Sequence, residues 1–170
     1  MNFHHRLMLR AGVLISAAFV AAGTAGAAST MDRAGAHLHT VEALRAVLAA
    51  KPGVVSAMSE NRLPELIELE TQIEKNVKEA RRQMNAAFIS GAWKSREIKR
   101  EGADVIGRIE AVQQLNFISL AFLTGYPSFT KKTPASVADA THRMFEQVDS
   151  LLATLDTLNR KVDEGGQRAE

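Results

Sequence analysis

The sequence predicts an all-α protein, built as an elongated antiparallel bundle of three long helices plus a short N-terminal helix. Apolar residues recur at alternating intervals of three and four along segments of about 27 to 33 residues, which is the helical period. Short connections rich in glycine and proline separate these segments, and short connections favour antiparallel neighbours. No segment shows the strict alternation of apolar and polar residues that indicates a β-strand.

The chain begins with the three parts of a secretory signal peptide. Residues 1–10 hold two arginines and no acid, residues 11–22 are almost continuously apolar, and Ala25-Gly26-Ala27 fits the small-x-small cleavage rule. The apolar part is about a dozen residues long, whereas a membrane span needs about 20. We therefore expect cleavage and a periplasmic or secreted protein, with membrane attachment only if this segment is kept as an anchor.

Removal of this segment changes the charge balance of the chain. The full sequence has 21 basic and 19 acidic residues, and without the two arginines of the leader both numbers are 19. A nucleic-acid-binding protein is expected to keep a basic surplus, so nucleic acid is not an expected partner. The absence of cysteine excludes disulfides, thiolate metal sites and Fe–S clusters, so stability must come from packing.

The first helical segment is short in this interpretation. Thr40 is placed as the N-cap of a helix over residues 41–50, and Lys51-Pro52-Gly53 is expected to end it, with room for another helical turn or two over residues 54–59. The expected organisation is a signal peptide, a flexible lead-in, a helical bundle domain and a disordered tail, over residues 1–27, 28–40, 41–163 and 164–170 respectively.

The second helix is expected from Pro64, a favourable first-turn residue, to Ser90, with Gly91 as the residue that ends it. Glu70 is the one charged interruption of its apolar stripe. The stripe itself comprises Leu66, Ile73, Val77, Ala80, Met84 and Ala87.

The third helix is expected over residues 92–124, charged in its first turns and apolar on more than one face in its second half. Asn116 and Ser119 continue the apolar stripe of this helix, and polar residues there either set helix register or line a polar groove. Gly102 and Gly107 each cost about 1 kcal/mol relative to alanine in a helix interior, which a closely crossing helix would make tolerable.

Residues 125–134 form the clearest loop, because proline and glycine interrupt the helix twice. The last helix follows over residues 135–163 and has the most regular stripe in the chain, with heptad spacing. Its members are Val137, Thr141, Met144, Val148, Leu151, Leu155, Leu158 and Val162.

Candidate metal and catalytic groups are few. His37 and His39 are two residues apart, but no third ligand stands at a suitable spacing, so they are interpreted as solvated histidines. His142 and Glu146 share a helix face, which fits a surface ion pair better than a general base with its orienting carboxylate. No metal, no cofactor and no catalytic residue is therefore assigned, and an enzyme is the less favoured class.

Two sets of residues are candidate binding sites. The aromatic residues at helix ends and in the loop, with two neighbouring lysines, are candidates for partner contacts because such aromatic side chains often anchor interfaces. These are Trp93, Tyr126, Phe129, Lys131 and Lys132. A second set of cationic residues is the candidate for binding an anionic small molecule, and it comprises Arg81, Arg82, Lys94, Arg96 and His142.

Two functional hypotheses follow. The first is a non-catalytic binding or assembly protein of the cell envelope, such as a secretion-system accessory factor, whose partner is another envelope protein or a second copy of itself. The second is a periplasmic bundle that binds a small molecule or metal, with an enzyme acting on an anionic substrate as one form of it. The architecture suggests both by analogy alone.

Overall fold

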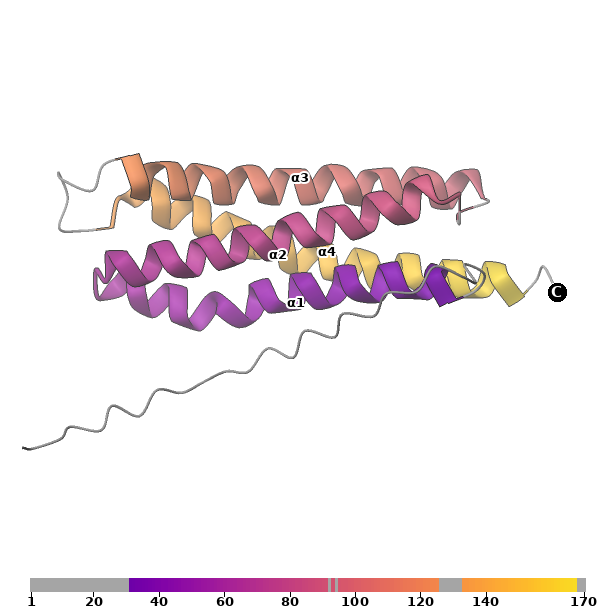
Figure 1. The fold of residues 1–170 in the computed structure, drawn as a ribbon, viewed down its shortest axis with the longest axis horizontal. Coiled ribbons are helices and arrows are strands. Elements are labelled where there is room, and N and C mark those ends of the chain that lie inside the picture. The colour runs from indigo at the N-terminus through magenta and orange to yellow at the C-terminus, as the bar shows by residue number, and fades with distance from the viewer. Residues whose placement is uncertain (1–30, 92, 94, 126–132, 168–170) are drawn as a thin grey trace, which may run out of the picture.

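The computed structural model describes residues 31–91, 93, 95–125 and 133–167, which form four α-helices. The helices α1 (Met31–Ser59), α2 (Leu63–Ile89), α3 (Arg96–Gly125) and α4 (Ala135–Gln167) contain 29, 27, 30 and 33 residues. They lie alongside one another as an elongated antiparallel bundle (Figure 1). The predicted all-α antiparallel bundle is thus confirmed.

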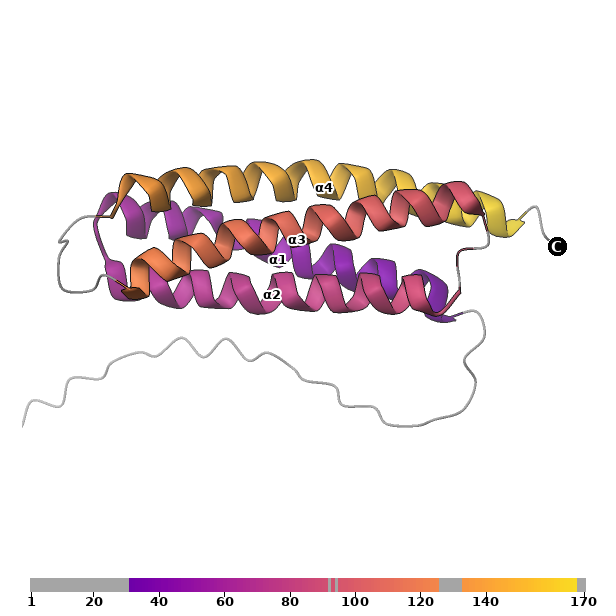
Figure 2. The same cartoon turned by 90° about the horizontal axis from the view of Figure 1, so that it is seen from above.

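The four helices are arranged so that each packs on its neighbours in the chain, and α4 returns to pack on α1. Two views at right angles show the same arrangement (Figures 1 and 2). Within the described residues, α1 makes no close backbone contact with α3, nor α2 with α4. These two pairs therefore face each other diagonally across the core.

The expectation of a short first helix is wrong. Helix α1 begins at Met31, within the segment expected to be a flexible lead-in, and runs through Pro52 to Ser59. Thr40 is fully buried inside it and is not an N-cap. A proline in a helix interior costs about 3 kcal/mol, but Val54 and Ala57 beyond it are fully buried. Their burial against the neighbouring helices offsets that local cost, so the helix continues.

The apolar stripes predicted for the other helices are confirmed. In α2 the buried residues are the six predicted apolar positions together with Glu70. Gly91 follows this helix with a φ of 69°, the left-handed conformation that ends many helices. In α4 the predicted heptad positions from Val137 to Leu158 are buried, and Val162 is partly buried.

The observed ends of α3 and α4 differ from the predicted ends by a few residues. Helix α3 begins at Arg96 rather than near residue 92. Helix α4 continues to Gln167, so part of the segment expected as a disordered tail is helical, and residues 168–170 lie outside the described residues. The signal-peptide prediction also falls outside them, because the description begins at residue 31. None of the described helices is both long and apolar enough to cross a membrane.

Trp93, in the connection between α2 and α3, is part of the core. Its side chain is only 2% exposed and meets the ring of Phe88 edge-on, with 5.9 Å between the ring centroids. The indole lies directly over Gly102 of α3, whose missing side chain leaves the space that the ring occupies. The glycine thus makes room for a tryptophan rather than for a crossing helix.

Candidate functional site

The most distinctive chemical feature of the bundle is a polar cluster inside its apolar core. Glu70 of α2, Asn116 and Ser119 of α3 and Thr141 of α4 make up this cluster, which we call the Glu70 cluster. All four side chains are at most 1% exposed. Buried carboxyl groups are rare in cores because a charge loses its hydration there, so this cluster needs a physical explanation.

The helices place these groups together through their own periodicity. Glu70 lies between Leu66 and Ile73 on the buried face of α2, at helical spacings of four and three. Asn116 and Ser119 lie one turn apart on the buried face of α3, and Thr141 occupies a heptad position of α4. Buried apolar residues lie one turn before and after Glu70 and Thr141, and Val112 and Leu123 flank the Asn116–Ser119 pair.

Three donors surround the Glu70 carboxyl group. Asn116 Nδ2 donates to Glu70 Oε2 at 2.6 Å and also lies 3.0 Å from the Glu70 backbone oxygen. Thr141 Oγ1 donates to Glu70 Oε1 at 2.7 Å, and Ser119 Oγ donates to the same oxygen at 3.1 Å. The Glu70–Thr141 bond joins the diagonally opposed helices α2 and α4 across the centre of the core.

The electrostatic balance at Glu70 is set by burial. Desolvation raises the pKa of this carboxyl group, and hydrogen bonds from Thr141, Asn116 and Ser119 oppose that rise without cancelling it. No ion pair to Glu70 is present among the described residues. The Glu70 cluster is therefore a buried carboxyl group with neutral hydrogen-bond partners, and its burial keeps it out of contact with a small-molecule substrate.

The sequence carried partial signals of this cluster. Glu70 is the charged interruption of one apolar stripe, Asn116 and Ser119 continue a second stripe, and Thr141 belongs to a third. Periodicity placed all four on buried faces. It did not show that they meet, because contacts across 46 to 71 residues depend on how the helices are set against one another.

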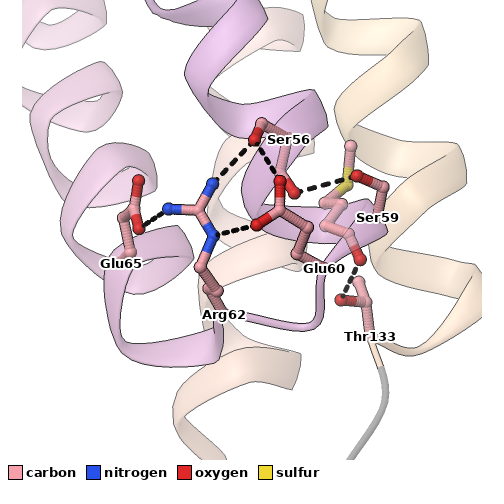
Figure 3. A network of polar contacts seen from close by, with 7 residues as sticks. Ser56, Ser59, Glu60, Arg62, Glu65 and Thr133 are labelled. Atoms are coloured by element: carbon pink, nitrogen blue, oxygen red, sulfur yellow. Dashed lines mark hydrogen bonds and ion pairs between the residues drawn. The ribbon is translucent and has the colours of Figure 1, made fainter.

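A second polar network closes the end of the bundle at which α1 meets α2 (Figure 3). The Arg62 guanidinium group contacts Glu65 and donates from Nη2 to Ser56 Oγ at 2.7 Å, and its Nε lies 3.0 Å from Glu60. Thr133 joins the same end, because its Oγ1 donates to the carbonyl oxygen of Met58 at 3.3 Å. This contact ties Thr133, just before α4, to the end of α1.

The candidate partner-binding residues fall into two groups. Trp93 is buried, so its side chain packs in the core and is not available for a surface contact. The other four, Tyr126, Phe129, Lys131 and Lys132, lie outside the described residues.

The structure brings together only part of the candidate anion-binding set. Arg81 and Arg82 border a shared surface hollow of about 390 Å³ with Lys78, Asn85 and Gln113. Each guanidinium group also has nearby protein partners: Arg81 Nη1 donates to Gln113 at 2.9 Å, and Arg82 pairs with Glu79 at 2.7 Å.

The remaining members of that set lie elsewhere. Arg96 is exposed at the start of α3, and His142 is exposed on α4, 3.2 Å from Glu146 as the expected surface ion pair. The side chain of Lys94 lies outside the described residues. His39 is exposed and paired with Glu42 at 3.1 Å. Among the described residues no three potential ligands gather to hold a metal ion.

Comparison with known proteins gives no relative for this chain. No protein-family model, no curated protein sequence and no solved structure matches it significantly. What the protein does therefore has to be inferred from its own residues.

Proposed function

We propose that this chain is an exported, non-catalytic helical protein that binds another envelope protein or a second copy of itself. The observation that carries the proposal is an apolar side chain on the outer surface of a long helix. Phe117 of α3 is 58% exposed, although it lies in the apolar second half of that helix. Aromatic side chains are enriched at protein–protein interfaces relative to the rest of the protein surface.

The surroundings of Phe117 support a protein contact. It borders a surface hollow of about 290 Å³ between α2 and α3, with Glu74, Arg81, Glu110 and two glutamines, Gln113 and Gln114. An aromatic anchor within a polar rim is the usual composition of a protein–protein contact. Helix α1 does not reach this face, because its close contacts are with α2 and α4.

A photocrosslinking experiment tests the binding proposal. A photoreactive amino acid replaces Phe117 in the full chain in cells, and a second variant carries it at Asp163, an exposed position near the end of α4. We expect a discrete crosslinked product from position 117 and none from position 163. Equal labelling at both positions, or no discrete product at 117, would contradict the proposal.

Export is tested separately by cell fractionation and by mass spectrometry of the N-terminus. The leader sequence predicts a processed protein that begins at Ala28, outside the cytoplasm. An unprocessed chain in the cytoplasm would overturn this half of the proposal without affecting the crosslinking result.

The hollow beside Arg81 and Arg82 supports a second candidate, the binding of an anionic small molecule. Three cationic side chains border it, but Lys78 is paired with Glu74 at 2.8 Å and Arg82 with Glu79. Titration calorimetry with inorganic phosphate and with a dicarboxylate tests this candidate. Saturable heat that is lost in Arg81→Gln and kept in Arg160→Gln would favour it over the first.

A further inference from the structure

We propose that the Glu70 cluster couples closure of the bundle to the uptake of one proton, so that a rise in pH weakens the closed state. The closed bundle holds Glu70 as a neutral acid, and its carboxylate is favoured when the helices separate and water reaches it. The proposal concerns the fold itself and does not depend on the proposed binding function.

The first support is that, within the described part of the chain, no charged side chain of a neighbouring helix forms an ion pair with Glu70. Helix α3 carries no charged residue from Ala111 to its end at Gly125. On α1, Lys51 places its Nζ atom 5.8 Å from the centre of the Phe145 ring. On α2, the next acidic residue along the helix, Glu74, is paired with Lys78.

The charged residues of α4 near Thr141 are also engaged elsewhere. Their side chains are between 60% and 68% exposed, and they form two ion pairs along the outer surface of the helix. These pairs are His142 with Glu146 and Arg143 with Asp139. Glu70 therefore has only neutral partners, and three neutral donors compensate a buried charge incompletely.

The second support is that the cluster accommodates a proton without moving. Hydroxyl groups both donate and accept, and the Ser119 and Thr141 oxygens are 3.2 Å apart, so either one can donate to the other. A protonated Oε1 can donate to Thr141 Oγ1 over the same 2.7 Å, while Thr141 donates to Ser119. Asn116 Nδ2 still donates to Oε2, so both oxygens of the neutral acid keep a hydrogen-bond partner.

The direction of the pH effect follows from proton linkage. Because burial raises the pKa of Glu70 above its ordinary value of 4.5, the folded state binds more protons than the unfolded state above that pH. The stabilisation by the bound proton is fully present below the unfolded pKa. It is lost as pH rises through the folded pKa, with a folding equilibrium constant that falls by up to about tenfold per pH unit.

The test compares the full chain with two variants. Glu70→Gln replaces the acid by a neutral group of the same shape, and Glu68→Gln is the matched control because Glu68 is exposed on the same helix. Urea unfolding is measured from about pH 5 upward, across the range in which the linkage acts. As pH rises, we expect the free energy of unfolding of the wild type and of Glu68→Gln to fall more steeply than that of Glu70→Gln. The difference in slope is expected to disappear toward acid pH.

A spectroscopic measurement on the same three proteins identifies the protonated group directly. Infrared difference spectra recorded over the same pH range are expected to show a carboxylic-acid C=O band that persists to higher pH than the bands of the exposed carboxyl groups. We expect this band in the wild type and in Glu68→Gln but not in Glu70→Gln. If Glu70→Gln does not fold, proton uptake on refolding of the wild type in a weakly buffered solution replaces the comparison. Parallel stability curves, an absent acid band in the wild type, or refolding without proton uptake would each overturn the proposal.

Discussion

The indole ring of Trp93 occupies the place where a side chain on Gly102 would be. A methyl group built on this glycine would overlap Cζ3 of the ring and stand only 2.6 Å from Cη2. Because Trp93 is 2% exposed and held against Phe88, the ring has little room to withdraw. This contact packs Trp93, in the connection between α2 and α3, directly onto α3.

Gly102→Ala is therefore expected to destabilise the protein, although alanine is the better helix former. The overlap displaces a buried ring, and overpacking of this kind costs about 1–3 kcal/mol. Gly107→Ala is the matched control in the same helix, since nothing lies within 4 Å of the added methyl group there. That variant is expected to gain up to about 1 kcal/mol. Urea unfolding followed by the fluorescence of Trp93, the single tryptophan, measures the stability of both variants. Equal gains in stability would contradict the close packing of Trp93 on Gly102.

Thr141→Val tests the bond that crosses the core from α4 to Glu70. Valine has nearly the shape of threonine but no hydroxyl group, so the carboxyl group loses a hydrogen-bond partner that lies 2.7 Å away. Loss of a buried hydrogen-bond partner costs about 1–3 kcal/mol in the free energy of unfolding.

Thr157→Val is the control for that substitution. Thr157 lies on the same helix and is exposed; it donates to the backbone oxygen of Ala153 at 3.2 Å and accepts from the exposed Arg160 at 3.4 Å. We expect it to change the stability by less than about 0.5 kcal/mol. Chemical denaturation of both variants at neutral pH compares their free energies of unfolding. Similar losses in the two variants would show that the hydrogen bond to Glu70 contributes no more to stability than an exposed threonine does.

Pro52→Ala is expected to stabilise the protein. Pro52 lies inside α1 and is exposed, so its ring contributes little packing while its missing N–H interrupts the helix. Removal of a proline from a helix interior gains up to about 3 kcal/mol. Thermal unfolding followed by circular dichroism measures the change, with Arg45→Ala, an exposed site on the same helix, as the control. A lower melting temperature for Pro52→Ala would mean that the proline shapes α1 for its packing.

The ion pair between Glu79 and Arg82 is expected to make a small pH-dependent contribution to the stability of the fold. Its sign is opposite to that of Glu70, because the pKa of Glu79 is lowered whereas that of Glu70 is raised. The hydrogen bond from Arg82 lowers the pKa of Glu79 from 4.5 to about 2. The pair therefore stabilises the fold above about pH 4.5, and that contribution is lost as pH falls through about 2. Since both side chains are largely solvated, Glu79→Gln should cost less than about 1 kcal/mol at neutral pH and low salt. Unfolding measured at two salt concentrations checks this, and a loss unaffected by salt would contradict a surface ion pair.

The sequence alone determined the class of fold and the faces that are buried. Hydrophobic periodicity depends on local geometry, so the stripe of α2 and the heptad of α4 were readable without any contact being known. It also marked Glu70 and Asn116 as polar groups on buried faces. The predicted end of the first helix near Pro52 is wrong. Proline disfavours a helix locally, but the burial of Val54 and Ala57 against other helices outweighs that local cost.

Only the tertiary structure decided which buried groups meet. Side chains far apart in the chain come together through the rotation and offset of whole helices, which no short-range pattern encodes. The three donors around Glu70 and the fit of Trp93 over Gly102 both depend on that offset. For the same reason residue type did not predict where the candidate binding residues lie: Trp93, a candidate for partner contacts, packs inside the core. Arg96 and His142, candidates for anion binding, lie apart on the surface.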